Sequence, residues 1–398
     1  MFPERQPVSS HIDAELQTRI GVALALKQRS SLVGIRFHVC DRVATLWGEV
    51  PSFFDRQIAV EAVKKVTGLR QVRDELTVAV HQRAGFTLPE LLVVLAVIGL
   101  LSSLLLPAVQ AVRESGRRTQ CVNNLKQLAL AVQSFHDAHG HLPASIRPSG
   151  LTAAARTSGL TLLLPFVERG DLYERYDLSR SWNEPENRDV VRTRVPLFQC
   201  PSTPQAERLD GIPEQTPWTD DIAGVTDYSP TTGVDIRLKS ADLVDAVGVG
   251  LISKNGRPTF ADVTDGLSNT FLFAESAGRP RLIRRGTLEV GAMQTTRVNG
   301  GGWARPASDF SVDGSSRDGG VVPGPWAINC TNGEDVGPVF PHPYYGTEGT
   351  GETFAFHASG ANIAFGDGSV RLLDEDIDIR EFARLVTRSE GEPCLGSH

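Results

Sequence analysis

An unbroken apolar segment in the first third of the chain limits its architecture more than any other feature. No charged residue lies between Glu90 and Arg113, so Leu91–Val112 forms 22 consecutive uncharged residues rich in Leu, Val, Ala and Ile. As a helix this segment extends about 33 Å, which is enough to cross a bilayer. Its apolar residues occupy all faces rather than one stripe. We therefore predict a transmembrane helix; a helix buried in a soluble core is the alternative.

The distribution of charge around this segment predicts its orientation. Residues 1–85 contain 12 Lys+Arg and 9 Asp+Glu, a net charge of +3, and residues 86–398 contain 28 and 38, a net charge of −10. Cytoplasmic flanks of membrane helices favour Lys and Arg. We therefore expect a single-pass inner-membrane protein, with residues 1–85 cytoplasmic and residues 113–398 periplasmic or extracellular. The overall charge of −7 gives no sign of a nucleic-acid partner.

Glu90 stands at the start of this apolar helix, where a carboxylate is costly. At the helix centre it would cost on the order of 2.5–3.5 kcal/mol on insertion scales, so it needs a partner that cancels its charge. The stretch Gly85-Phe86-Thr87-Leu88-Pro89-Glu90 resembles the signal of type IV pilins and type II secretion pseudopilins. The resemblance implies cleavage between Gly85 and Phe86 by a prepilin peptidase and methylation of Phe86. It also implies that Glu90 neutralises the N-terminal amine of a neighbouring subunit during assembly.

The residues before this signal have the pattern of a small α+β domain. Apolar spacing and alternation predict the order α-β-β-α-β, over residues 11–27, 31–40, 41–50, 54–66 and 69–80. Val43–Val50 and Gly68–Leu76 resemble two motifs of BON domains. The resemblance implies a bacterial envelope module that binds phospholipid or protein and is not an enzyme.

The residues after the apolar segment continue the helix and then become rich in strands and loops. Apolar residues at helical spacing extend to about residue 140, where Gly140 and Pro143 predict an end. Several motifs resemble a large family of bacterial prepilin-like proteins whose exported domain has no settled function. They are Cys200-Pro201-Ser202, Thr264–Thr270 with Glu275, Ile328-Asn329-Cys330, and His357 followed after nine residues by Asp367 and Gly368.

These patterns together predict an α+β chain in successive parts. A BON-like domain covers residues 1–80, and the end of the leader covers residues 81–85. A transmembrane segment covers residues 86–112, and its helix continues to about residue 140. Residues 141–398, called the head below, are expected to form a pilin-like domain with an antiparallel β-sheet.

Residues 353–373, near the end of the head, alternate as a three-stranded meander would. Two turns, at residues 358–360 and at Gly366-Asp367-Gly368, separate the expected strands. On that geometry His357 and Asp367 lie about a strand length apart, which argues against a catalytic dyad. We expect His357 to pack or hydrogen-bond at a strand end and Asp367 to cap the second turn.

Polar and cysteine clusters give weaker signals. Five cysteines occur without a Cys-x-x-Cys pair, so a zinc knuckle is not expected; we predict a disulfide between Cys121 and Cys200. The histidines near residue 139 are typical of a solvated helix end. No cofactor and no metal site are predicted, apart from one weak calcium candidate that would use loop oxygens. Its ligands would be Asp262, Asp265, Asn269 and Glu275.

The sequence thus predicts a non-catalytic protein, since it has no phosphate-binding loop, Gly-x-Ser-x-Gly elbow or His-Glu-x-x-His helix. The leading hypothesis is a membrane-anchored prepilin-like or pseudopilin-like subunit. Its partners would be membrane lipid, the prepilin peptidase and other pilin-like subunits or copies of itself. The alternative is a single-pass envelope protein whose head binds a ligand or glycan and does not polymerise.

Overall fold

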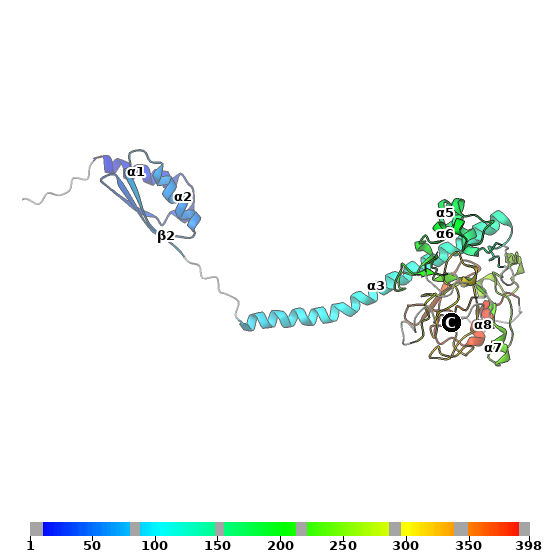
Figure 1. Ribbon diagram of the computed structural model, residues 1–398. Helices are drawn as coiled ribbons and strands as arrows, with labels where there is room; N and C mark the ends of the chain where they lie inside the picture. The colour runs from blue at the N-terminus through cyan, green and yellow to red at the C-terminus, as the bar shows by residue number, and fades with distance from the viewer. Residues whose placement is uncertain are drawn as a thin grey trace, which may run out of the picture. The chain divides into compact units, whose positions relative to one another are not determined.

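The computed structural model describes residues 11–79, 88–147, 155–211, 221–285, 296–337 and 349–389. The chain divides into two compact units, residues 1–101 and residues 102–398. The division falls within one long helix, α3 (Leu88–His139), whose first residues belong to the first unit and whose remainder belongs to the second (Figure 1).

The N-terminal domain has the predicted order α-β-β-α-β. Its elements are α1 (His11–Ala25), β1 (Arg36–Cys40), β2 (Val43–Val50), α2 (Phe53–Lys64) and β3 (Gln71–Val78). The sheet order is β1-β2-β3, in which β1 and β2 are antiparallel and β2 and β3 are parallel. Ser52 caps α2 by accepting a hydrogen bond from the backbone N–H of Asp55. Ile20, Leu46 and Val63 are fully buried in the core between helices and sheet.

Helix α3 runs without interruption for 52 residues and changes character along its length. Its apolar part, with Pro107 inside it, is long and apolar enough to cross a membrane, and none of it is buried within the protein. This exposure contradicts the alternative of a helix buried in a soluble core. From Cys121 onward one face of α3 is buried, at residues 121, 125, 128, 132 and 135. Gly140, with φ +74°, ends the helix by donating its N–H to the carbonyl of His136.

The head is built around a four-stranded antiparallel sheet with the order β11-β10-β8-β6. Its strands are β6 (Tyr228–Ser229), β8 (Phe271–Glu275), β10 (Gly360–Phe365) and β11 (Val370–Asp374). Two small sheets pair β4 (Leu209–Asp210) with β5 (Ala223–Gly224) and β7 (Thr231–Val234) with β9 (Phe310–Val312). The helices are α4 (Gly159–Leu163), α5 (Gly170–Arg175), α6 (Arg188–Val191), α7 (Ile236–Ser240) and α8 (Ile379–Val386). Short 3-10 turns of the head cover Leu164–Val167, Pro185–Asn187, Pro196–Phe198, Phe260–Asp262, Leu267–Asn269 and Pro306–Ser308. One further 3-10 turn, Ser30–Leu32, belongs to the N-terminal domain.

Two apolar clusters hold the head together, and the central strands contribute to both. The first cluster packs the buried face of α3 and residues of α4–α6 against Phe273 of β8 and Ala364 of β10. The second packs Phe271, Ile363 and Phe382 with β7, β9 and α8. The strand residues Ile363 and Ala364 point to opposite clusters, as the period of two in a strand requires. The second half of α3 therefore packs against the sheet, and α5 and α6 lie beside it (Figure 1).

The predicted three-stranded meander is only partly correct. Its second hairpin is confirmed: β10 pairs with β11, and Asp367 caps the turn by accepting a hydrogen bond from the N–H of Ser369. Its first strand is wrong, because residues 353 and 354 form only isolated bridges, to Ile328 and Ser276. The strand that pairs with the other edge of β10 is β8, far back in the sequence. An alternating pattern predicts a strand but does not identify its neighbour in the sheet.

Candidate functional site

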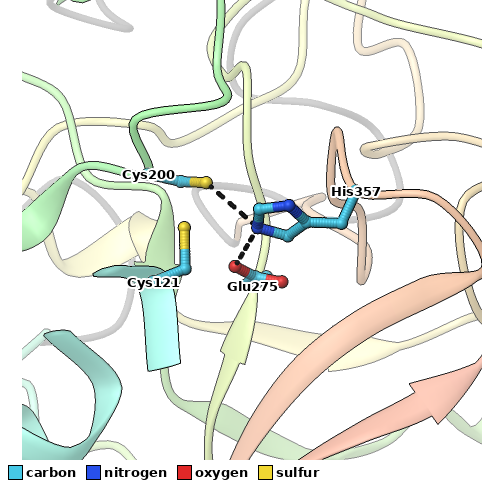
Figure 2. A group of neighbouring side chains, drawn as sticks. All are labelled: Cys121, Cys200, Glu275 and His357. Carbon is cyan, nitrogen blue, oxygen red and sulfur yellow. Dashed lines mark hydrogen bonds and ion pairs between the residues drawn. The ribbon is translucent and has the colours of Figure 1, made fainter. Parts of the chain in front are cut away.

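Four side chains that can bind a metal ion meet in the interior of the head (Figure 2). They are Cys121 on α3, Cys200 after the turn Pro196–Phe198, Glu275 at the end of β8 and His357 before β10. One ligand atom of each lies within 4.8 Å of those of the other three, and all four residues are buried. We call these four residues the buried cluster.

Two interatomic distances describe the centre of the buried cluster. His357 Nε2 lies 3.4 Å from Cys200 Sγ and 3.3 Å from Glu275 Oε1. The imidazole thus bridges a thiol and a carboxylate through one nitrogen, as the dashed lines in Figure 2 show. Its contact with Glu275 Oε1 lacks the geometry of a hydrogen bond, so this buried carboxylate oxygen has no hydrogen-bond partner in the structure.

The other nitrogen of the imidazole is held by Glu114, from α3. His357 Nδ1 lies 2.6 Å from Glu114 Oε1. Glu114 also accepts hydrogen bonds from Arg117 and Ser202. Partial burial raises the pKa of Glu114, but these hydrogen bonds outweigh it and the net pKa is lowered. Glu114 is therefore a charged acceptor that orients the ring of His357 so that Nε2 faces the thiols.

Backbone and amide groups position the remaining members of the buried cluster. The N–H of Cys200 donates to Asp227 Oδ2 at 3.0 Å. The side-chain amide of Asn124, on α3, donates at 3.1 Å to the carbonyl of Gln199, the residue before Cys200. Glu275 Oε2 accepts from the backbone N–H and the side-chain amide of Asn362, at 2.7 and 3.1 Å. Both Cys200 and Glu275 are thus held in place by interactions that leave Sγ and Oε1 directed at His357.

The electrostatics of the buried cluster favour the charged forms of His357 and Cys200 and the neutral form of Cys121. Burial lowers the pKa of His357, but its interactions with the Cys200 thiol and the Glu275 carboxylate outweigh burial and raise the pKa to about 11. The hydrogen bond from Cys121 lowers the pKa of the Cys200 thiol, and that from His357 lowers it further against the effect of burial. The same Cys121–Cys200 hydrogen bond, together with burial, raises the pKa of Cys121. Cys200 is thus the thiol of the pair that loses its proton more readily, and it lies beside a protonated imidazole.

Several of the predicted site residues meet here, in an arrangement that the sequence did not indicate. Cys121 and Cys200, the predicted disulfide partners, are neighbours, but the structure holds them as free thiols. Their disulfide stays a prediction. His357 is buried and hydrogen-bonded, whereas Asp367 is exposed at its turn and is not a member of the buried cluster.

The four residues of the weak calcium candidate lie in different surroundings in the structure. Glu275 belongs to the buried cluster, whereas Asp262 is exposed and its carboxylate accepts from the N–H and hydroxyl of Thr259. Asn269 donates to the backbone carbonyl of Asp265, so its amide stabilises the local turn. One oxygen of Asp262 and the amide nitrogen of Asn269 are thus engaged in local hydrogen bonds, and calcium binding stays a prediction.

The processing and assembly residues lie at or beyond the start of α3. Gly85 and Phe86 fall outside the described residues, as does Cys394. Glu90 lies in the first turn of α3 and is exposed. That position agrees with a carboxylate at the N-terminal end of the apolar segment, where the helix dipole also favours negative charge.

The buried cluster is the feature that sequence reasoning missed. Its members are separated by 79, 75 and 82 residues, whereas common zinc motifs place pairs of ligands two to five residues apart. Cys200, Glu275 and His357 each belong to a motif that resembles the prepilin-like family. The occurrence of these three residues in motifs of one family was the available signal. The motifs alone do not indicate that the three side chains meet in space.

Comparison with known protein families agrees with this architecture. The chain carries a prokaryotic N-terminal methylation motif over residues 80–106 and a BON domain over residues 12–80. Together with the apolar part of α3, the methylation motif points to a pilin-like chain anchored in a membrane by a single helix. The model for the protein family of unknown function DUF1559 matches residues 110–380, and the chain belongs to this family. No curated protein matches the chain.

Proposed function

We propose that the protein is a non-catalytic, membrane-anchored prepilin-like or pseudopilin-like subunit of an envelope assembly or secretion system such as type II secretion. The observation that carries this proposal is the continuity of α3. Its first part follows the methylation motif, is apolar on all faces and is not buried, and its second part packs under the sheet of the head. A helix built in this way can join subunits within a membrane while it holds the head outside.

The proposed topology places residues 1–85 in the cytoplasm and residues 113–398 on the other side of the inner membrane. The charge difference of +3 against −10 across the apolar segment supports this orientation. The segment boundaries proposed are 1–80 for the BON domain, 81–85 for the leader end, 86–112 for the span and 141–398 for the head. Phe53 and Phe54, exposed at the start of α2, support a BON surface for phospholipid or protein.

Glu90 distinguishes a filament subunit from a simple anchor. In the Glu90→Ala chain we expect crosslinking to itself or to other pilin-like subunits in membranes to fall at least about tenfold, because the partner amine loses its counter-charge. Membrane insertion should be unchanged or improved. A matched control is Ser103→Ala, which removes a polar group from the same helix. Undiminished crosslinking in Glu90→Ala chains would favour the alternative, an envelope protein that binds a ligand and does not polymerise.

Cys40 reports the side of the membrane on which the BON domain lies. It is an exposed free cysteine, whereas Cys121, Cys200 and Cys330 are buried. In cells without prepilin peptidase, and with Cys394 replaced by serine, an impermeant thiol reagent should label Cys40 only after the membrane is opened. Lys239 is exposed on the head. In a chain that lacks Cys40 and carries Lys239→Cys, the reagent should label position 239 in intact cells. Labelling of Cys40 in intact cells would reverse the topology.

A further inference from the structure

We propose that Cys121, Cys200, Glu275 and His357 bind one zinc ion in a closed structural site inside the head. The ion would join α3 to strand β8, to the segment that precedes β10 and to the loop that carries Cys200. This proposal concerns the buried cluster alone, and it holds or fails independently of whether the protein assembles with other subunits.

The spacing of the ligand atoms matches a tetrahedral zinc ion. Zinc binds sulfur at about 2.3 Å and nitrogen or oxygen at about 2.0–2.1 Å. Tetrahedral angles then separate a sulfur from a nitrogen by about 3.6 Å and a nitrogen from an oxygen by about 3.3 Å. The Cys200 Sγ–His357 Nε2 and His357 Nε2–Glu275 Oε1 distances are 3.4 and 3.3 Å. Two of the six separations therefore match one tetrahedral shell, and all four ligand atoms lie within 4.8 Å of one another.

The groups around the four ligands are those that a metal site uses to orient its ligands. A histidine that binds a metal through one nitrogen usually donates its other N–H to a carboxylate, and His357 Nδ1 faces Glu114 Oε1 at 2.6 Å. Glu275 Oε2 is held by Asn362, which leaves Oε1 directed into the cluster without a hydrogen-bond partner. A zinc ion would give this buried oxygen the direct partner that His357, at 3.3 Å and without hydrogen-bond geometry, does not provide.

The ligand set identifies the ion. Thiolate, imidazole and carboxylate groups all bind zinc, and a set that combines sulfur with nitrogen ligands favours this ion. Four protein ligands leave no open coordination position, and all four residues are buried, so the site has the properties of a structural rather than a catalytic centre. A Cys121–Cys200 disulfide would use only two of the four groups and would leave Glu275 Oε1 without a hydrogen-bond partner.

Metal analysis of the full chain tests this proposal. The protein would be purified in detergent through a tag without histidine, and its metal content measured by mass spectrometry. We expect about one zinc ion per chain, which a strong chelator removes with a fall in the melting temperature of roughly 10 °C. Replacement of zinc by Co²⁺ should produce thiolate-to-cobalt charge-transfer bands and tetrahedral ligand-field bands. A wild-type chain that contains no zinc, does not bind Co²⁺ and has Cys121 joined to Cys200 would overturn the proposal.

Variants locate the ion and control for misfolding. Cys200→Ser and Glu275→Gln should reduce the zinc content at least about tenfold. Cys330→Ser changes another buried free cysteine, outside the cluster, and should retain one zinc ion and the cobalt bands. Zinc that persists in both cluster variants would place the ion elsewhere and contradict the proposal. Should both variants fail to fold, the wild-type Co²⁺ spectrum still decides, since an ion bound without thiolates lacks the charge-transfer bands.

Discussion

Replacing Asp227 by alanine is expected to destabilise the head by about 3–5 kcal/mol, because it removes one partner of a buried ion pair. Arg208 and Asp227 lie 2.6 Å apart, with side chains that are 4% and 1% exposed. Asp227 also accepts hydrogen bonds from the backbone N–H groups of Cys200 and Gly278. The variant would leave a buried guanidinium without its carboxylate and two buried N–H groups without acceptors.

Thermal unfolding of the full chain in detergent measures this effect. A matched control is Glu207→Ala, since Glu207 pairs with Arg194 at the surface and its side chain is 83% exposed. We expect no measurable change in the melting temperature of that variant. The double variant Asp227→Leu with Arg208→Met should recover part of the lost stability, because it removes both charges. Equal melting temperatures for Asp227→Ala and Glu207→Ala would contradict this account of the head.

Replacing Gly85 by valine is expected to leave the chain uncleaved. The chain matches the prokaryotic N-terminal methylation motif over residues 80–106, and the proposed cut follows Gly85. A branched side chain at that position should block a peptidase that accepts glycine there. Immunoblots of membranes should then show only the full-length chain, with at least about a tenfold loss of the shorter form.

Gly99→Val is the control for this substitution. It makes the same change inside the apolar part of α3, where a Cβ atom would meet no other atom within 4 Å. Cleavage of this variant should therefore equal that of the wild type. Normal cleavage of the Gly85→Val chain would show that the cut lies elsewhere or depends on other residues.

The elements that depend on local pattern could be predicted from the sequence. The α-β-β-α-β order of the N-terminal domain is confirmed, because each element carries its own periodicity and the turn at Asp41-Arg42 separates the first two strands. The length of α3 is confirmed as well, since an apolar run, an amphipathic run and Gly140 indicate its course and its end.

The features that depend on distant contacts could not be predicted in this way. The pairing of β10 with β8 joins residues about 90 positions apart. The alternation at residues 353–357 predicted a nearer neighbour that the structure does not have. The buried cluster combines one residue from each of four distant segments. Each of these residues has an ordinary local explanation, so only the fold shows that their ligand atoms converge.

The N-terminus of the mature protein tests the central claim, that this chain is processed and anchored as a prepilin-like subunit, most directly. The wild-type protein would be extracted from the membranes of cells with an active prepilin peptidase, and its intact mass and N-terminal sequence determined. We predict a chain that begins at Phe86 and carries an N-methyl group. A mature protein that still begins at Met1 in those cells would contradict the account.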